Sequence, residues 1–84
     1  MTPDKIVGKK ILKIIYNRYD NTLSNFTLLH NIEKEYNPIR CALNGTTRLT
    51  IEMALYVLGK LYGEDMAVQK LSEILRSIVE YKGD

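Results

Sequence analysis

The sequence predicts an all-α fold, a compact bundle of four main helices and one short helix. Apolar residues recur at intervals of three and four in the long segments, and no segment alternates polar and apolar residues for long enough to form a strand. Turn-forming Gly, Pro and Asn residues separate these segments. The 84 residues suffice for a single domain, residues 1–84, and 45% of them are hydrophobic, which favours a packed core. The expected helices span residues 3–20, 25–36, 38–43, 48–62 and 65–82.

The first expected helix, residues 3–20, is amphipathic and has a basic face. Thr2 suits its N-cap position, and Pro3 suits its first turn. At 100° per residue, its apolar side chains fall within an arc of about 160°. These side chains are Val7, Ile11, Leu12, Ile14, Ile15 and Tyr19. The opposite side carries Lys5, Lys9 and Lys13 at intervals of four residues, with Lys10 and Tyr16 beside them.

A break at residues 20–22 precedes the second expected helix, residues 25–36, for which Ser24 is a suitable N-cap. Asn37 should end this helix, because a residue that precedes proline avoids the α-helical region. Pro38 can then open the short helix at residues 38–43.

Asn44 and Gly45 form a strong left-handed stop for that short helix, after which Thr46 or Thr47 can cap residues 48–62. This fourth helix is apolar on almost every side. We therefore expect it to be central in the bundle or covered by another chain.

The last expected helix, residues 65–82, follows a stop at Gly63 and has an acidic start. Its apolar residues step at intervals of three, four and three, which is typical of a coiled-coil seam. The seam residues are Val68, Leu71, Leu75 and Ile78. A homodimer through this C-terminal helix is therefore possible.

Several classes of function are excluded by what the sequence lacks. Cys41 is its single cysteine and His30 its single histidine, so it forms neither an internal disulfide nor a cysteine zinc site. Nucleotide-binding glycine motifs, nucleophile motifs and metal signatures are absent from the sequence. We therefore expect no enzymatic activity, no cofactor and no metal, and we interpret His30 and Cys41 as packed side chains.

No apolar stretch reaches the length of a signal peptide or the roughly 20 residues of a membrane span. We accordingly expect a cytoplasmic protein without membrane contact. The abundance of Ile, Lys, Asn and Tyr, whose codons are rich in A and T, suggests an A/T-rich genome, such as an archaeal or viral one.

Positive charge is concentrated near the start of the chain. The net charge is +2, but residues 1–20 carry +3 and residues 64–84 carry −2. Several cations on one rigid face suit the phosphates of nucleic acid. The predicted contacts with the nucleic-acid backbone are Lys5, Lys9, Lys10, Lys13 and Tyr16, whose ring could also stack on a base. This stripe contains no arginine, the usual reader of bases, so sequence-specific reading by it is not expected.

These observations favour a non-enzymatic accessory or adaptor subunit of a nucleic-acid-processing complex. The chain contains six Tyr, a residue that concentrates at core rims and interfaces. For docking on a larger protein we expect Tyr56, Tyr62 and Met66, the last being an apolar residue on the polar side of its helix.

Two alternatives remain open. In the first, residues 38–43 and 48–62 form the helix-turn-helix of a dimeric DNA-binding regulator, with Arg40, Thr47, Arg48 and Thr50 at the bases. In the second, the protein is a purely structural helical oligomer without a nucleic-acid role.

Overall fold

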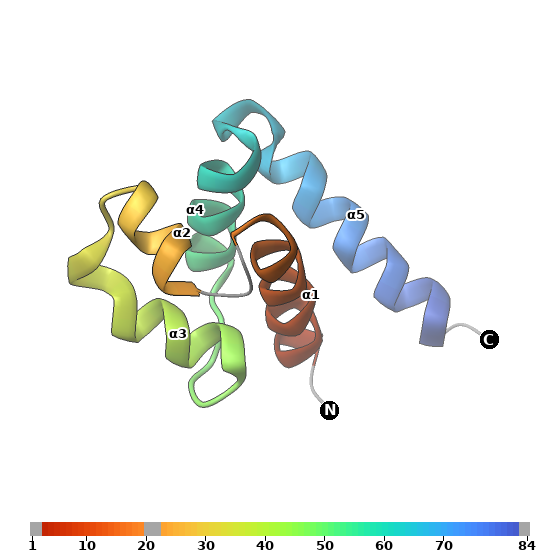
Figure 1. Ribbon diagram of the computed structural model, residues 1–84. Coiled ribbons are helices and arrows are strands. Elements are labelled where there is room, and N and C mark those ends of the chain that lie inside the picture. The colour runs from red at the N-terminus through yellow and green to blue at the C-terminus, as the bar shows by residue number, and fades with distance from the viewer. Residues whose placement is uncertain (1–2, 20–22, 83–84) are drawn as a thin grey trace.

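The computed structural model describes residues 3–19 and 23–82, and all regular structure within these ranges is helical (Figure 1). The all-α prediction is therefore confirmed. The elements are α1 (Pro3–Arg18), α2 (Leu23–Leu29), a single 3-10 turn (Glu33–Glu35), α3 (Tyr36–Asn44), α4 (Ile51–Tyr62) and α5 (Glu64–Lys82). The expected N-cap Thr2 and the expected break at residues 20–22 lie outside the described residues. None of the described helices is both long and apolar enough to cross a membrane.

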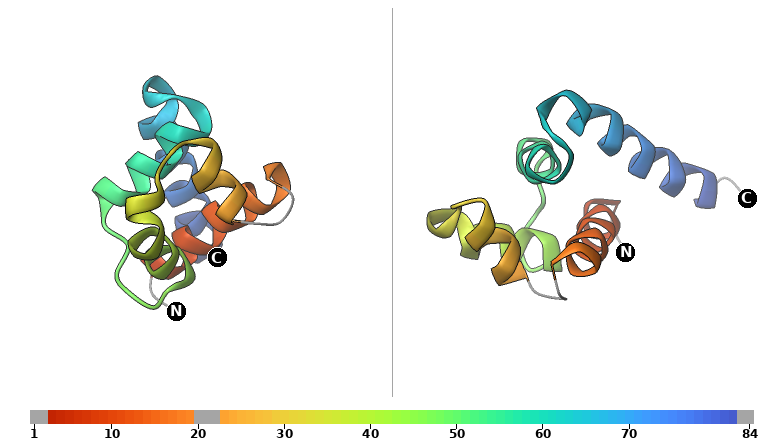
Figure 2. Two further views of the ribbon diagram at one scale, coloured as in Figure 1. Left: turned by 60° about the vertical axis from the view of Figure 1, so that its left-hand side comes forward. Right: turned by 45° about the horizontal axis from the view of Figure 1, so that its top comes forward.

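The helices divide into two groups that meet at α1. Helices α1, α2 and α3 pack against one another, and α4 and α5 form a helical hairpin that packs on the other side of α1 (Figure 2). Val7, Ile11 and Ile15 of α1 are almost completely buried. The helix at the centre is therefore α1, and the prediction of a central helix at residues 48–62 is wrong. The expectation fails because one side of α4 is exposed, the side that carries Ile51, Glu52, Tyr56 and Lys60.

Helices α1 and α3 approach each other very closely at Gly8, where α1 crosses the end of α3. A Cβ atom on Gly8 would lie 2.6 Å from the carbonyl oxygen of Leu43 and 3.2 Å from its Cα atom. Real Cβ atoms essentially never approach backbone this closely. Only glycine therefore lets the two backbones meet at this point.

Helix α2 is shorter than expected, because Asn31 ends it. The Asn31 backbone is left-handed, with a φ of 54°. Its N–H donates to the Leu28 carbonyl, and the Ile32 N–H donates to the Thr27 carbonyl, which is the pattern of a Schellman motif. The prediction of one helix over residues 25–36 is therefore wrong at both ends: α2 begins at Leu23 and ends at Leu29.

Helix α3 begins before Pro38 rather than at it. Pro38 lies in the first turn, where a backbone N–H would have no partner within the helix, so the ring is tolerated there. The predicted stop is confirmed: Gly45 has a φ of 89° and its N–H donates to the Cys41 carbonyl. The short helix expected at residues 38–43 is thus extended at both ends.

Helix α4 starts three residues later than expected. Its N-cap is Thr50, whose side-chain oxygen accepts a 3.1 Å hydrogen bond from the Met53 N–H. Thr46, Thr47 and Arg48, which were expected at or inside the helix start, instead belong to the connection between α3 and α4.

Helix α5 forms over the range predicted, but its buried face is rotated from the expected seam. Leu71 and Ile78 are buried as expected, whereas Val68 is 63% exposed and Leu75 is 43% exposed. Ala67 packs into the core in their place. The hairpin with α4 covers only one side of the 3-4-3 pattern, and the other side remains in solvent.

We predict that Gly8→Ala destabilises the protein although alanine favours helices. The added methyl group forces α1 and α3 apart, which should lower the free energy of unfolding by about 1–3 kcal/mol. Gly59→Ala in α4 is the matched control, because a Cβ atom built there lies 3.9 Å from its nearest neighbour, the Cα atom of Glu64. That change should raise the free energy of unfolding by about 0.5–1 kcal/mol. Urea unfolding of both variants measures this, and a Gly8→Ala protein as stable as the parent would contradict the prediction.

Candidate nucleic-acid interface

The four lysines of α1 lie on its solvent-facing side. Lys5, Lys9, Lys10 and Lys13 are all exposed, and Tyr16 on the same side is 39% exposed. The opposite side of α1 carries the core residues, so the backbone of the helix holds the lysines away from the protein interior. The stripe is therefore open to a ligand, as a phosphate-binding face requires.

Two of these lysines border a groove that was not predicted from the sequence. The groove has a volume of about 380 Å³ and runs between α1 and α5. Lys10 and Lys13 line its α1 side, and Lys70 of α5 adds a third ammonium group. Glu73 also lines it and lies 3.4 Å from the Lys70 Nζ atom. Lys70 is 57 residues beyond Lys13 in the chain, so only tertiary packing brings these cations together.

At one end of this groove, Arg18 joins α1 to the hairpin. Its Nη1 atom donates a 2.8 Å hydrogen bond to the Leu61 carbonyl, and its guanidinium lies 4.5 Å from the centre of the Tyr62 ring. The Lys70 ammonium lies 4.9 Å from the same ring. Tyr62, which was expected to dock on a partner, is half-buried and already contacts two cations. Its ring helps to hold α5 beside α1.

Lys5 differs from the other lysines of the stripe, because it lies beside the C-terminal end of α3. The closest atoms to a Cβ built on Gly45 are the Lys5 side-chain carbons, at 3.4–3.8 Å. The stem therefore packs on the turn that ends α3. A cation at a helix C-terminus interacts favourably with the helix dipole, so Lys5 also stabilises the end of α3.

The four residues expected at the bases in the alternative interpretation do not lie on a helix-turn-helix of α3 and α4. These two helices are joined by residues 45–50 and do not pack closely against each other. Arg40 is exposed on α3, and Thr47 and Arg48 are exposed on the connection. The Thr50 hydroxyl caps α4. The helix pair proposed from the sequence is therefore not formed.

The three residues expected to dock on a partner are not gathered on one surface. Tyr56 is 36% exposed and lines a groove with Leu55 and Val68, whereas Tyr62 lines the groove on the α1 side of the hairpin. Met66 is 37% exposed and borders neither.

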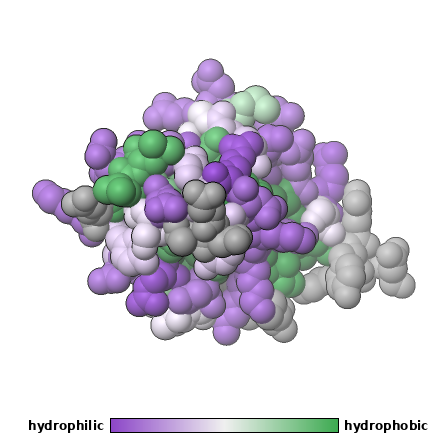
Figure 3. Space-filling view, viewed as in Figure 1, coloured by the Kyte–Doolittle hydropathy of each residue, from purple (hydrophilic) through white to green (hydrophobic). Residues whose placement is uncertain are grey.

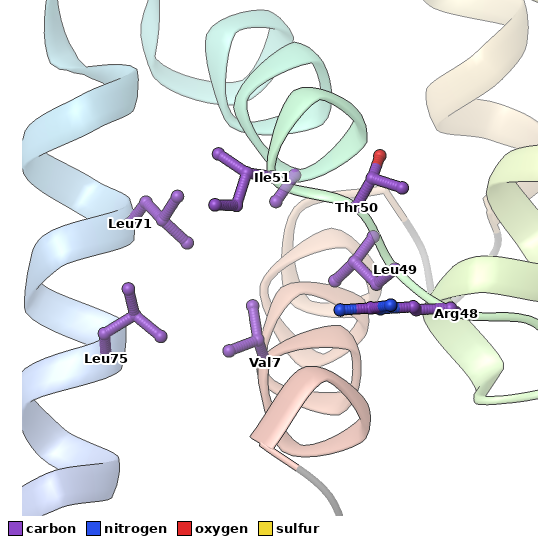
Figure 4. A pocket seen from close by; sticks show the side chains of 8 residues that line it. Val7, Arg48, Leu49, Thr50, Ile51, Leu71 and Leu75 are labelled. Atoms are coloured by element: carbon purple, nitrogen blue, oxygen red, sulfur yellow. The ribbon is translucent and has the colours of Figure 1, made fainter.

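A more apolar groove opens where α1, α4 and α5 meet. Its volume is about 320 Å³. Leu71 and Leu75 project from α5 towards Ile51 and Val7, and Leu49 completes the apolar lining (Figure 4). Arg48 and Thr50 are the polar residues in this lining. The sequence signal for this groove was the seam residue Leu75, which widens the apolar side of the last helix beyond what one partner helix covers.

A second hydrophobic patch lies over α2 on the face shown in Figure 3, where hydrophilic side chains cover most of the remaining surface. Leu28 is 65% exposed and Leu29 is 66% exposed. The early end of α2 leaves these leucines without a covering helix.

His30 is half-buried in an aromatic cluster. Its ring centre lies 5.0 Å from that of Phe26, and its Nε2 atom lies 3.2 Å from the Tyr19 hydroxyl oxygen. Burial, and secondarily the positive charge of Lys60, lower the pKa of His30. Cys41 is half-buried as a free thiol. Among the described residues, no group of three His, Cys, Asp or Glu side chains could hold a metal ion.

Comparison of the chain with protein-family models, with curated proteins and with solved structures finds no match.

We predict that His30 makes the stability of the protein pH-dependent. Its pKa is lower in the folded state than in the unfolded chain, where the usual value is about 6.5. The unfolded chain then binds more protons, so the free energy of unfolding should fall as the pH drops below this value. Urea unfolding at pH 7.5 and pH 5.5, about one unit on either side of it, should show a smaller fall for His30→Gln than for the parent. Equal falls in the two proteins would contradict the assignment.

Proposed function

We propose that this protein is a non-enzymatic accessory subunit that binds the backbone of nucleic acid through α1 and docks on a larger protein through the α4–α5 hairpin. The observation that carries the proposal is the convergence of Lys10, Lys13 and Lys70 on one groove, with Lys9 exposed on the adjoining face. Spaced ammonium groups along a groove are suited to successive phosphates of a strand.

The distribution of charge over the two helix groups supports this orientation. Residues 1–50 contain eight Lys or Arg and four Asp or Glu, a net charge of +4. Residues 51–84 contain four Lys or Arg and six Asp or Glu, a net charge of −2. A polyanion is therefore attracted to the side that carries α1, and the hairpin is left for a partner of another kind.

The apolar groove supports docking on a protein. Ile51 is 71% exposed at its edge, and Leu75 is 43% exposed in its lining. Covering such side chains is favourable, and contiguous exposed apolar surface is typical of interaction sites. A groove accepts a protruding side chain, whereas a two-fold interface would set groove against groove, so a different protein suits it better than a second copy.

We predict that the lysines of α1 carry the affinity for nucleic acid. Fluorescence anisotropy with a labelled duplex should give a log–log slope of about −3 to −4 between about 50 and 200 mM salt, as expected for four phosphate contacts. Lys9→Glu/Lys13→Glu should weaken binding strongly, because both side chains are exposed and the change reverses the charge along the stripe.

Lys60→Glu/Arg76→Glu is the matched control for that experiment. It changes the net charge by the same amount at two exposed positions of the hairpin. We expect this variant to bind nearly as well as the parent. Equal losses in the two double variants would show a response to total charge alone, and a parent that fails to bind at low salt would contradict nucleic-acid binding.

We predict that the isolated chain is a monomer of 9.7 kDa, because the apolar groove is proposed to bind a different protein. Sedimentation equilibrium over a wide range of concentration measures the mass. A dimer that dissociates on Leu75→Lys, a change in the apolar groove, would show that a second copy occupies the groove. That result would favour the dimeric regulator or the structural oligomer over the adaptor.

A further inference from the structure

Helices α2 and α3 follow each other in the order of a helix-turn-helix, one element earlier than the pair that the sequence suggested. Residues 30–32 separate the end of α2 from the 3-10 turn that leads into α3. The left-handed Asn31 occupies the place in the turn where a glycine is common, and buried Ile32 follows it directly. Two hydrogen bonds of the Schellman motif hold this turn in one conformation.

The two helices are supported by α1 in a three-helix arrangement. Phe26 of α2, Ile39 and Leu43 of α3, and Ile11 of α1 are all completely buried, and each of the three helices packs against the other two. The side of α3 that carries Ile39 and Leu43 is thus anchored to the core. Its other side is exposed to solvent, as a helix must be if it is to be inserted into a groove of DNA.

The outward side of α3 carries side chains that suit base reading. Asn37 and Arg40 are exposed, and at 100° per residue they fall within about 60° of each other. Asn44 is exposed beside them, but its side-chain oxygen accepts a 2.9 Å hydrogen bond from the Thr46 N–H and is therefore used in the turn that ends α3. Arginine pairs in bidentate fashion with guanine, and asparagine with adenine, in the major groove. The nine residues of α3 include no acidic side chain to oppose this contact.

We propose that α3 enters the major groove of duplex DNA and reads bases with Arg40 and Asn37. The inference rests on the proposed function, which supplies binding to the phosphate backbone, and it deepens that function by naming the ligand as duplex DNA of a preferred sequence. It also assigns the reading helix to the α2–α3 pair and not to α3 and α4.

The charges around α3 orient it on the DNA. Lys5 packs on the turn after α3, and Arg48 is exposed a few residues further along the chain. Both cations are at the C-terminal end of the helix. Glu35 is exposed at the opposite end, at the N-cap position. Phosphates are therefore favoured near Gly45, at the C-terminal end of α3.

The test is selection of a preferred duplex from a random library with the full chain, followed by anisotropy on the selected and a scrambled duplex. Arg40→Ala and Asn37→Ala should each reduce the preference for the selected duplex tenfold or more. Arg40→Lys should lose the preference too, because it keeps the charge but not the planar pair of donors. All three should bind the scrambled duplex within a factor of a few of the parent.

Two controls separate reading from other effects. Arg76→Ala, at an exposed position of α5, should leave the preference for the selected duplex unchanged. Lys9→Glu/Lys13→Glu should weaken binding to both duplexes equally. Circular-dichroism melting of every variant checks folding, and because Arg40 is exposed, Arg40→Lys should melt with the parent.

The outcomes distinguish this inference from the proposed function. Lysine-dependent binding without any preferred duplex overturns the reading role of α3 and leaves backbone binding intact. A preference that survives Arg40→Ala but is lost with Thr47→Ala or Arg48→Ala also overturns it, since the reader is then the α3–α4 connection. Tighter binding to a single strand than to the duplex overturns it as well. Absence of any binding overturns both proposals.

Discussion

The arrangement of this protein depends on the contact between α1 and α3 at Gly8. Because Gly8 has no side chain, the α1 backbone can lie directly against the carbonyl of Leu43. That approach brings Ile11 and Leu43 into one fully buried cluster, and it sets the position of α3 against the helix that carries the lysines. A larger residue at this point would separate the two helices, and with them the basic stripe and the outward face of α3.

The same helix also supports the second half of the molecule. Helix α1 packs against the hairpin of α4 and α5 on its other side, where Arg18 connects it to the Leu61 carbonyl and to the Tyr62 ring. The ring of Tyr62 is therefore used for packing. A chain of 84 residues is too small to cover every apolar side chain, and Ile51 and Val68 remain exposed to solvent.

The two proposed surfaces follow from this division. The N-terminal helices hold the positive charge and the polar outward face of α3, whereas the hairpin is acidic overall and has the apolar groove. The lysine stripe and the lining of the apolar groove have no residue in common. A small subunit that joins a larger protein to DNA requires this separation of surfaces.

The amino-acid sequence predicted the all-α class, the last helix, the stop at Gly45 and the exposure of the lysine stripe, because periodicity and left-handed glycine caps are local properties of the chain. It did not determine that Asn31 would end α2, since asparagine adopts the left-handed conformation only where the surrounding structure favours it. The role of Gly8, the meeting of Lys13 with Lys70, and the exposure of Val68 were decided by tertiary structure alone. Each depends on which helix lies beside which, and a hydrophobic pattern states that a face is buried without naming the element that buries it.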